Sequence, residues 1–215
     1  MDLSVLVVRR QLTKVFGGPH HGTEFSMERA CPRCGTGAEQ VGPLRLNRFS
    51  LPTAAIFLTL DHEVLMRLTL GETLRASGVT CLGDVIDARS GDRLDVLQLR
   101  SEATLPPFAP QTTGITRERP CPTCARDGHY GIPHVKCGLQ YDTLEGAWQS
   151  KNVLATYERF GTSVLRQPFR DSVFAAPLFV VSRRVAAALR AANLEYVELH
   201  SVDIARDNRH EDSVG

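Results

Sequence analysis

Four cysteines in two separate Cys-x-x-Cys pairs are the side chains of this sequence best suited to chemistry. The first pair lies in the segment CPRCG at residues 31–35, and the second lies in the segment CPTC at residues 121–124. Two intervening residues let both sulfurs of a pair reach one ion, and the proline and glycine help the backbone turn its N–H groups toward the sulfurs. Each pair is half of a tetrahedral thiolate site, so the simplest prediction is one ion shared by Cys31, Cys34, Cys121 and Cys124.

A shared site of this kind predicts structural Zn²⁺ as the cofactor. Four thiolates fill the tetrahedral coordination of zinc and leave no open position for water, which a catalytic zinc requires. Structural zinc can contribute ~10 kcal/mol of folding free energy, which is large for a single folded domain. The ion would also hold residue 31 close to residue 124, so the first 125 residues would form one folded unit.

The spacing of the other ligand-type residues leaves two alternatives open. The second pair could close locally around one ion with His134 and Cys137, in a C-x2-C-x9-H-x2-C series, while His20 or His21 assists the first pair. Alternatively, the two pairs are dithiols that bind no metal, although neither pair obviously opens a helix as a thioredoxin-like redox pair does.

No other motif predicts an enzyme. The chain has no G-x-S-x-G segment, phosphate-binding loop or dinucleotide fingerprint, and His62-Glu63 lacks the second histidine of a zinc-protease helix. Cys81 lies in an apolar context and is predicted to be a buried small residue. We therefore predict no catalytic residue.

The composition favours a globular protein whose main ligand is not nucleic acid. Hydrophobic residues make up 42% of the 215 residues, charged residues make up 23%, and the formal net charge is +1. These are ordinary values for a folded domain, and no basic stripe stands out. Neither a secretory signal nor an apolar run of membrane-spanning length is visible, so we expect a cytoplasmic location with no membrane contact.

The hydrophobic pattern predicts both strands and helices along the first half. We expect a strand at Ser4–Val8, a helix that Asp61 caps and whose apolar face includes Val64, and a strand at Leu94–Leu99. Gly71 is expected to break the helix. Prolines between residues 104 and 120 predict an extended connector that leads into the second cysteine pair.

The last 40 residues contain the clearest local signals. A buried-type strand at Ala176–Val181 precedes Ser182, which is suited to cap a helix at Arg183–Ala192. Asn193 suits a left-handed helix end, and a further strand follows around Tyr196. A strand, a ten-residue helix and a strand predict a βαβ-like unit.

Parts of this unit are weakly similar in sequence to segments in the first half. Leu74–Val79 resembles Leu189–Leu194, and Val85–Arg89 resembles Val202–Arg206. Either the chain contains two related helix–strand units, or helix ends simply look alike.

These elements together predict an α+β fold. It would have mixed sheets, a zinc-ribbon-like element built from the two distant pairs, and a C-terminal βαβ-like unit. We divide the chain into an N-terminal region at residues 1–138 that carries both pairs and an inserted α/β segment, a C-terminal α/β unit at 139–206, and a disordered tail at 207–215. A short helix is expected at Leu144–Trp148.

Two C-P-x-C pairs about ninety residues apart, in a chain of this length, resemble the double-CXXCG proteins of myxobacteria. The segment Ala176–Ser182 with its following helix, the segment Leu194–Leu199 and the middle segment Leu74–Val85 are also similar to that family. The resemblance spans most of the chain, and the cysteine pairs are its most specific part. One departure is Ala125, which stands where the family has the glycine of its second motif.

The resemblance implies an immunity protein of a swarm-inhibition system. Members of the family are assigned to bind and neutralise cognate toxins of contact-dependent bacterial competition, and they supply no catalytic residues to transfer. The expected partner is therefore a protein toxin domain. The alternative function is a zinc-ribbon nucleic-acid-binding or regulatory adaptor, which the near-neutral charge does not favour.

Overall fold

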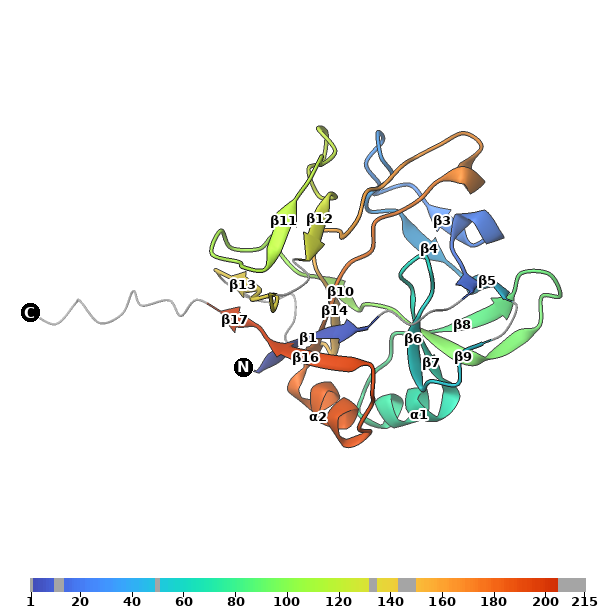
Figure 1. Ribbon diagram of the computed structural model, residues 1–215. Helices are drawn as coiled ribbons and strands as arrows, with labels where there is room; N and C mark the ends of the chain where they lie inside the picture. Colours follow the sequence, from blue (N-terminus) through green and yellow to red (C-terminus); the bar gives the residue numbers. More distant parts are fainter. Residues whose placement is uncertain (1, 10–13, 49–50, 132–134, 143–149, 205–215) are drawn as a thin grey trace, which may run out of the picture.

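Two mixed β-sheets and two short helices form most of the regular secondary structure (Figure 1). The computed structural model describes residues 2–9, 14–48, 51–131, 135–142 and 150–204. Strands predominate over helices, which confirms the predicted α+β class. The predicted helix at Leu144–Trp148 and the tail at 207–215 lie outside the described residues.

One sheet contains five strands in the order β10–β14–β15–β1–β16. All of its pairings are antiparallel except the parallel pairing of β10 with β14. Strand β1 begins one residue before the predicted strand Ser4–Val8 and ends at the same residue. The strands are β1 Leu3–Val8, β10 Ala103–Thr104, β14 Val153–Ala155, β15 Phe179–Ser182 and β16 Val197–Ser201.

The other large sheet contains six strands in the order β2–β5–β8–β9–β7–β6. Its one parallel pairing joins β5 to β8. The strand predicted at Leu94–Leu99 is the central β9. The strands are β2 Val15–Phe16, β5 Leu44–Arg48, β6 Ile56–Leu58, β7 Val64–Arg67, β8 Leu82–Asp87 and β9 Arg93–Leu99.

The two sheets contain matching strand–helix–strand units. In the first unit, β7 runs directly into α1 (Leu68–Ala76) and then β8, while in the second, β15 runs directly into α2 (Arg183–Ala191) and then β16. The strand and helix bounds correspond at a constant spacing of 115 positions (64 to 179 and 68 to 183). The helix ends also correspond, because Gly78 and Asn193 both have positive φ. The similarity of Leu74–Val79 to Leu189–Leu194 therefore marks two similar units. The second similarity, of Val85–Arg89 to Val202–Arg206, has a different spacing of 117 positions, and residues 205–206 lie outside the described residues.

Each unit encloses one further strand of opposite direction. Strand β9 lies between β7 and β8, and β1 lies between β15 and β16, with every pairing antiparallel. The predicted βαβ-like order at the C-terminal end is present, but its two strands are separated by the first strand of the chain.

The prediction that Val64 lies in a helix is wrong. Residues 64–67 form β7, and the helix begins only at Leu68. The short apolar run VLM fits either structure, and pairing with β6 and β9 decides in favour of the strand. Gly71 lies inside α1 rather than ending it. A Cβ at that position would lie 2.5 Å from Leu97 Cδ1, so only glycine fits there without a shift of Leu97. The glycine lets the helix lie close to β9.

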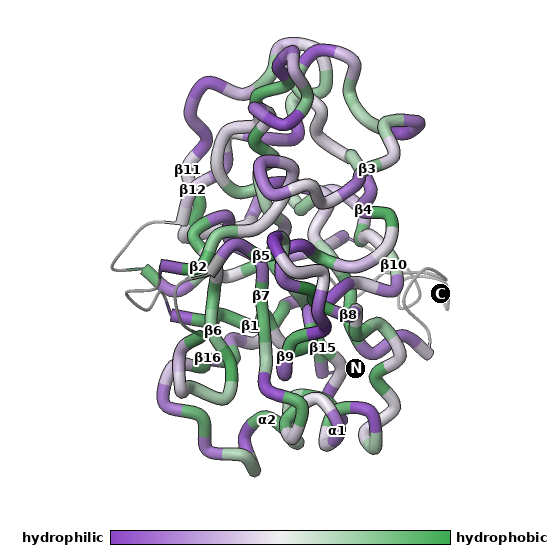
Figure 2. The backbone as a smooth tube through the Cα atoms, turned by 90° about the vertical axis from the view of Figure 1, so that its right-hand side faces the viewer, coloured by the Kyte–Doolittle hydropathy of each residue, from purple (hydrophilic) through white to green (hydrophobic). Residues whose placement is uncertain are grey.

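The largest hydrophobic core lies between the two sheets and the two helices. Alternate residues of the central strands face it, and the other residues face a separate core on the far side of each sheet. In β9, for example, Leu97 and Leu99 face the shared core, whereas Leu94 and Val96 face the outer one. Figure 2 shows the hydrophobic segments along these strands, with α1 and α2 at one end of the molecule.

Two β-hairpins lie at the end opposite the helices (Figures 1 and 2). In each hairpin, one cysteine pair lies in the connection between the strands. The remaining elements are a small parallel sheet and two 3₁₀ turns. The bounds are β3 Glu24–Ser26 with β4 Glu39–Val41, β11 Ile115–Arg117 with β12 His129–Gly131, β13 Gln140–Tyr141 with β17 Asp203–Ile204, and the turns η1 Pro19–His21 and η2 Phe169–Asp171.

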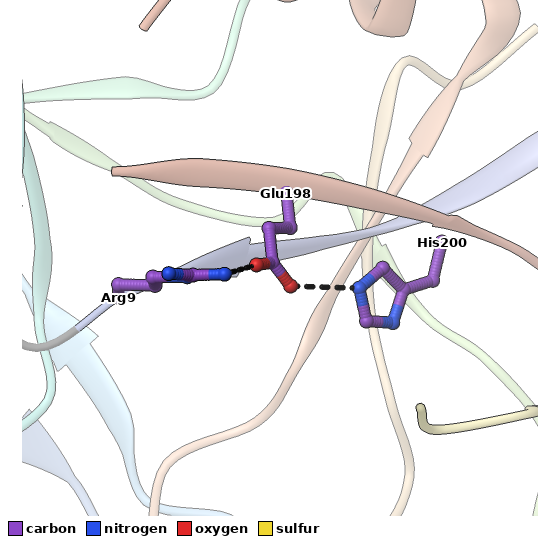
Figure 3. A network of polar contacts seen from close by, with 3 residues as sticks. All are labelled: Arg9, Glu198 and His200. Carbon is purple, nitrogen blue, oxygen red and sulfur yellow. Dashed lines mark hydrogen bonds and ion pairs between the residues drawn. The ribbon is translucent and has the colours of Figure 1, made fainter. Parts of the chain in front are cut away.

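Ion pairs occupy similar places in the two units. Arg93 of β9 contacts Asp84 of β8 at 2.7 Å, and Arg9, just after β1, contacts Glu198 of β16. Figure 3 shows the second pair, in which the other carboxylate oxygen of Glu198 lies 3.0 Å from His200 Nε2. Both pairs link a central strand to the strand that follows the helix.

Neither described helix is long and apolar enough to cross a lipid bilayer.

Candidate metal centre

The four cysteines of the two hairpins meet in one place. Their sulfurs all lie within 4.8 Å of one another, although the hairpins are 90 positions apart in the sequence. Cys31 Sγ is 3.9 Å from Cys121 Sγ, and Cys34 Sγ is 3.7 Å from Cys124 Sγ. The first three cysteines are buried, and Cys124 is partly buried.

Both cysteine pairs have the same local backbone. Gly35 N–H donates to Cys31 C=O, and Ala125 N–H donates to Cys121 C=O, each at 2.8 Å. Gly35 and Ala125, the residues that follow the pairs, have φ values of +80° and +57°. The left-handed turn predicted from the glycine therefore also forms at the alanine, where a Cβ makes it cost about 1–2 kcal/mol.

Gly35 is required for a second reason, which does not apply to Ala125. A Cβ at Gly35 would lie 2.4 Å from Phe174 Cε1. Phe174 belongs to an aromatic cluster with Phe25 and Phe169, with ring centroids 5.3–6.5 Å apart. The first hairpin is thus packed against an aromatic side chain that comes from the second half of the chain.

The thiols favour a shared cation electrostatically. Burial raises the pKa of Cys34 to about 12. Burial also opposes ionisation of Cys121, but N–H groups of Cys124 and Thr123 and the neighbouring thiols donate to its sulfur and lower its pKa to about 7. Anionic sulfurs this close together repel one another, and a shared positive ion would offset that repulsion.

A buried polar network supports the cluster, and its residues were not among those predicted from the sequence. Asp127, which is 1% exposed, accepts hydrogen bonds from Cys121 N–H at 2.7 Å and from Ser163 N–H at 3.0 Å. Thr36 lies between Cys34 Sγ at 3.1 Å and Ser163 Oγ at 2.9 Å. Ser163 therefore connects Thr36 of the first hairpin to Asp127 of the second through hydrogen bonds. The one available signal was the position of Asp127, three residues after Cys124.

The alternative in which Cys121 and Cys124 bind an ion together with His134 and Cys137 gains no support from the described residues. Cys137 is partly buried elsewhere and donates to Gly114 C=O at 3.6 Å, while His134 lies outside the described residues. His20 and His21 lie in η1 and are not part of the cluster. Within the described part of the chain, no other group of three or more His, Cys, Asp or Glu side chains is placed to bind one ion.

The donor set fits a tetrahedral metal ion. A Zn–S distance of 2.3 Å places tetrahedral sulfurs about 3.8 Å apart, which agrees with the two distances between the hairpins. All six cysteines are free thiols, so no disulfide competes for these sulfurs. Four cysteine ligands, most of them buried, could hold a metal ion and would complete its coordination without water.

Comparisons of the chain with models of known protein families and with curated proteins find no match.

Proposed function

We propose that the four cysteines hold structural Zn²⁺ and that the chain is an immunity protein that binds and neutralises a protein toxin. The observation that carries the first part is the closed set of four sulfurs, three of them buried, between two hairpins from distant parts of the sequence. An ion held in this way has no exchangeable position for a substrate, so it stabilises the fold rather than performing a reaction.

The second part is supported by the resemblance of both cysteine pairs and the helix-containing segments to double-CXXCG immunity proteins. A protein of this kind acts by surface complementarity, with the affinity concentrated in a few aromatic and arginine side chains. Zinc would keep the two hairpins, and the surfaces attached to them, in one arrangement. No catalytic side chain is needed for this activity.

The test of immunity uses the gene adjacent to the one that encodes this chain. Its product is expressed in a sensitive bacterial host with and without this protein, and survival is counted. We expect toxicity without the chain and survival with it, together with co-purification of the two proteins. An adjacent product that is not toxic, or toxicity that the chain does not relieve, would refute the immunity assignment.

A further inference from the structure

A cleft runs between the first hairpin and segments from the second half of the chain. It consists of two adjoining hollows of about 310 and 730 Å³. Both hollows are lined by Phe25 of β3, Glu63, Arg159, Pro177 and Phe179. The larger hollow also follows the connection from β9 to β10. Together the two hollows form one surface on the same hairpins that carry the cysteines.

Arginines are concentrated in the larger hollow. Four of them line it, together with three glutamates, and the aromatic ring of Tyr157 lies among them. The arginines come from the first hairpin, the β9–β10 connection, the second hairpin and the segment after β14, and they are Arg29, Arg100, Arg126 and Arg159.

Three of these arginines have partners within the protein. Arg29 pairs with Glu39 at 3.7 Å, and Arg100 donates to Gln40 C=O at 2.6 Å. The guanidinium of Arg126 donates to Tyr157 C=O and lies 4.1 Å from the centre of the Tyr157 ring.

The side chain of Arg159 is different. Among the described residues, no carboxylate lies within ion-pair distance of its guanidinium, and no acceptor forms a hydrogen bond with it. Burial and the neighbouring Arg126 lower the pKa of Arg159 to about 10, so it remains charged at neutral pH. The adjacent Glu158 attracts this charge and raises the pKa of Arg159, but it forms no direct ion pair with the guanidinium, and burial raises the pKa of the Glu158 carboxyl itself. A partly buried cation without a directly paired anion is unfavourable, so the site favours an anionic ligand.

The glutamates of the cleft do not neutralise this charge. Glu39 is paired with Arg29, and Glu102 accepts from Thr80 Oγ1 and Asn152 N–H. Burial raises the pKa of Glu63, whose carboxylate accepts from Gln98 at 2.6 Å.

The backbone of Arg159 is positioned by the second hairpin. Arg159 N–H donates to Arg126 C=O at 2.7 Å, and Arg159 C=O accepts from His129 N–H at 3.3 Å. Arg126 is two residues beyond Cys124. The same arrangement that brings the cysteines together therefore places this guanidinium in the cleft.

The smaller hollow has an aromatic surface. Phe25 and Phe174 line it, and their rings meet edge to face at 5.3 Å. Arginine and aromatic residues in a concave surface are the combination typical of the strongest contacts in protein interfaces. Two adjoining hollows, one lined by arginines and one by aromatic rings, suit a peptide chain better than a compact anion.

We propose that this cleft binds an acidic segment of a protein partner, with a carboxylate of that segment paired to Arg159 and an adjacent apolar side chain against Phe25 and Phe174. The inference rests on the proposed partner-binding function and specifies which surface and which chemistry it uses. A carboxylate that pairs with Arg159 replaces water around an otherwise unpaired guanidinium, so this contact should dominate the affinity.

The test presents the purified full chain to a displayed library of random dodecapeptides. We expect enrichment of peptides with Asp or Glu beside an aromatic or aliphatic residue. The selected peptide is then synthesised with a fluorescent label and titrated against the protein. The variant Arg159→Met should lower its affinity at least about tenfold, the loss expected for one charge-assisted contact.

A matched control and a stability measurement complete the test. Arg93→Met removes an exposed arginine that does not line the cleft, and it should leave peptide affinity unchanged. Arg159→Met should keep or raise the thermal midpoint, because it removes a partly buried charge that has no direct ion-pair partner. Selection without acidic enrichment, or peptides that bind both arginine variants equally well, would overturn the proposal. Displacement of the peptide by millimolar inorganic phosphate alone would instead assign the site to a small anion.

The toxin assay separates this proposal from the proposed function. If wild type and Arg159→Met protect cells equally, immunity stands and the cleft is not its binding surface. If acidic peptides bind through Arg159 but no adjacent toxin is neutralised, the cleft stands and the immunity assignment fails.

Discussion

The two cysteine hairpins have the same backbone but are held in place by different means. In the first, Gly35 allows the left-handed turn and leaves room for Phe174. In the second, Ala125 adopts the turn at a conformational cost, and the buried carboxylate of Asp127 binds the N–H of Cys121. One hairpin is thus supported mainly by packing, and the other mainly by hydrogen bonds.

The difference shows that the first hairpin depends on side chains from the second half of the chain. Phe174, which packs on the first hairpin, lies in the second half, and Ser163 of the second half connects the hydrogen-bond networks of both hairpins. The two hairpins are therefore equivalent in local geometry but not in support. Variants at matching positions should separate the two contributions.

The largest expected effect comes from removing a cysteine. Cys31→Ser and Cys121→Ser should each abolish zinc binding and lower the free energy of unfolding by about 5 kcal/mol or more, because a tetrahedral site with one ligand missing loses most of its ~10 kcal/mol contribution. Metal analysis of the purified proteins and urea unfolding measure both effects. Cys137→Ser is the control and should retain zinc. If Cys31→Ser retains zinc while Cys121→Ser and Cys137→Ser lose it, the ion belongs to the second half alone.

The next effect concerns the hydrogen-bonded hairpin. Asp127→Ala leaves the N–H groups of Cys121 and Ser163 buried without an acceptor, so it should cost about 3 kcal/mol of unfolding free energy. It should also weaken zinc retention against a chelator by roughly 10- to 100-fold. Asp127→Asn retains one carbonyl acceptor and should lose less. Equal zinc retention in wild type, Asp127→Ala and Asp127→Asn would show that this network does not support the metal site.

Reciprocal substitutions at the two turns should have opposite signs. Gly35→Ala should cost about 2–3 kcal/mol of unfolding free energy, because the left-handed turn is strained and Phe174 must move. Ala125→Gly should raise the free energy of unfolding by up to about 1 kcal/mol. Glycine relieves the strain of the left-handed turn but loses more chain entropy on folding. Urea unfolding of both variants checks this. Destabilisation by Ala125→Gly would mean that the Ala125 methyl group makes a packing contribution larger than the strain.

The smallest effect is expected at the two corresponding ion pairs. Asp84→Asn and Glu198→Gln should each lower stability at pH 7 by less than about 1 kcal/mol, because both pairs are exposed. Arg9, and then His200, lower the pKa of Glu198 below its ordinary value of 4.5. Its contribution is therefore complete above about pH 4.5 and is lost as the pH falls through the lowered value. Thermal melts of wild type and Glu198→Gln should converge at acidic pH, and a constant difference would contradict the pairing.

Local patterns in the sequence predicted several elements closely. Ser182 caps the second helix through a hydrogen bond from Val185 N–H, and Asn193 has the expected left-handed conformation. The prediction failed at Val64, where a short apolar run carries no signal that separates a strand from a helix. It also failed at Gly71, whose role depends on the distance to a strand more than 20 residues later.

The sequence by itself determined the four cysteines as candidate ligands, because two residues between cysteines constrain a turn that needs no distant contact. It also indicated two similar helix–strand units from their matching helix ends. Only the tertiary structure brought the cysteine pairs together, since that requires both sheets to pack around one shared core. The same packing buries Asp127 beside Cys121 and places Arg159 in a cleft. In the sequence, Asp127 is marked only by its position three residues after Cys124, and Arg159 is not marked at all. Spacing within a few residues can be read along the chain, whereas the surroundings of a lone charge are set by segments that lie far away in the sequence.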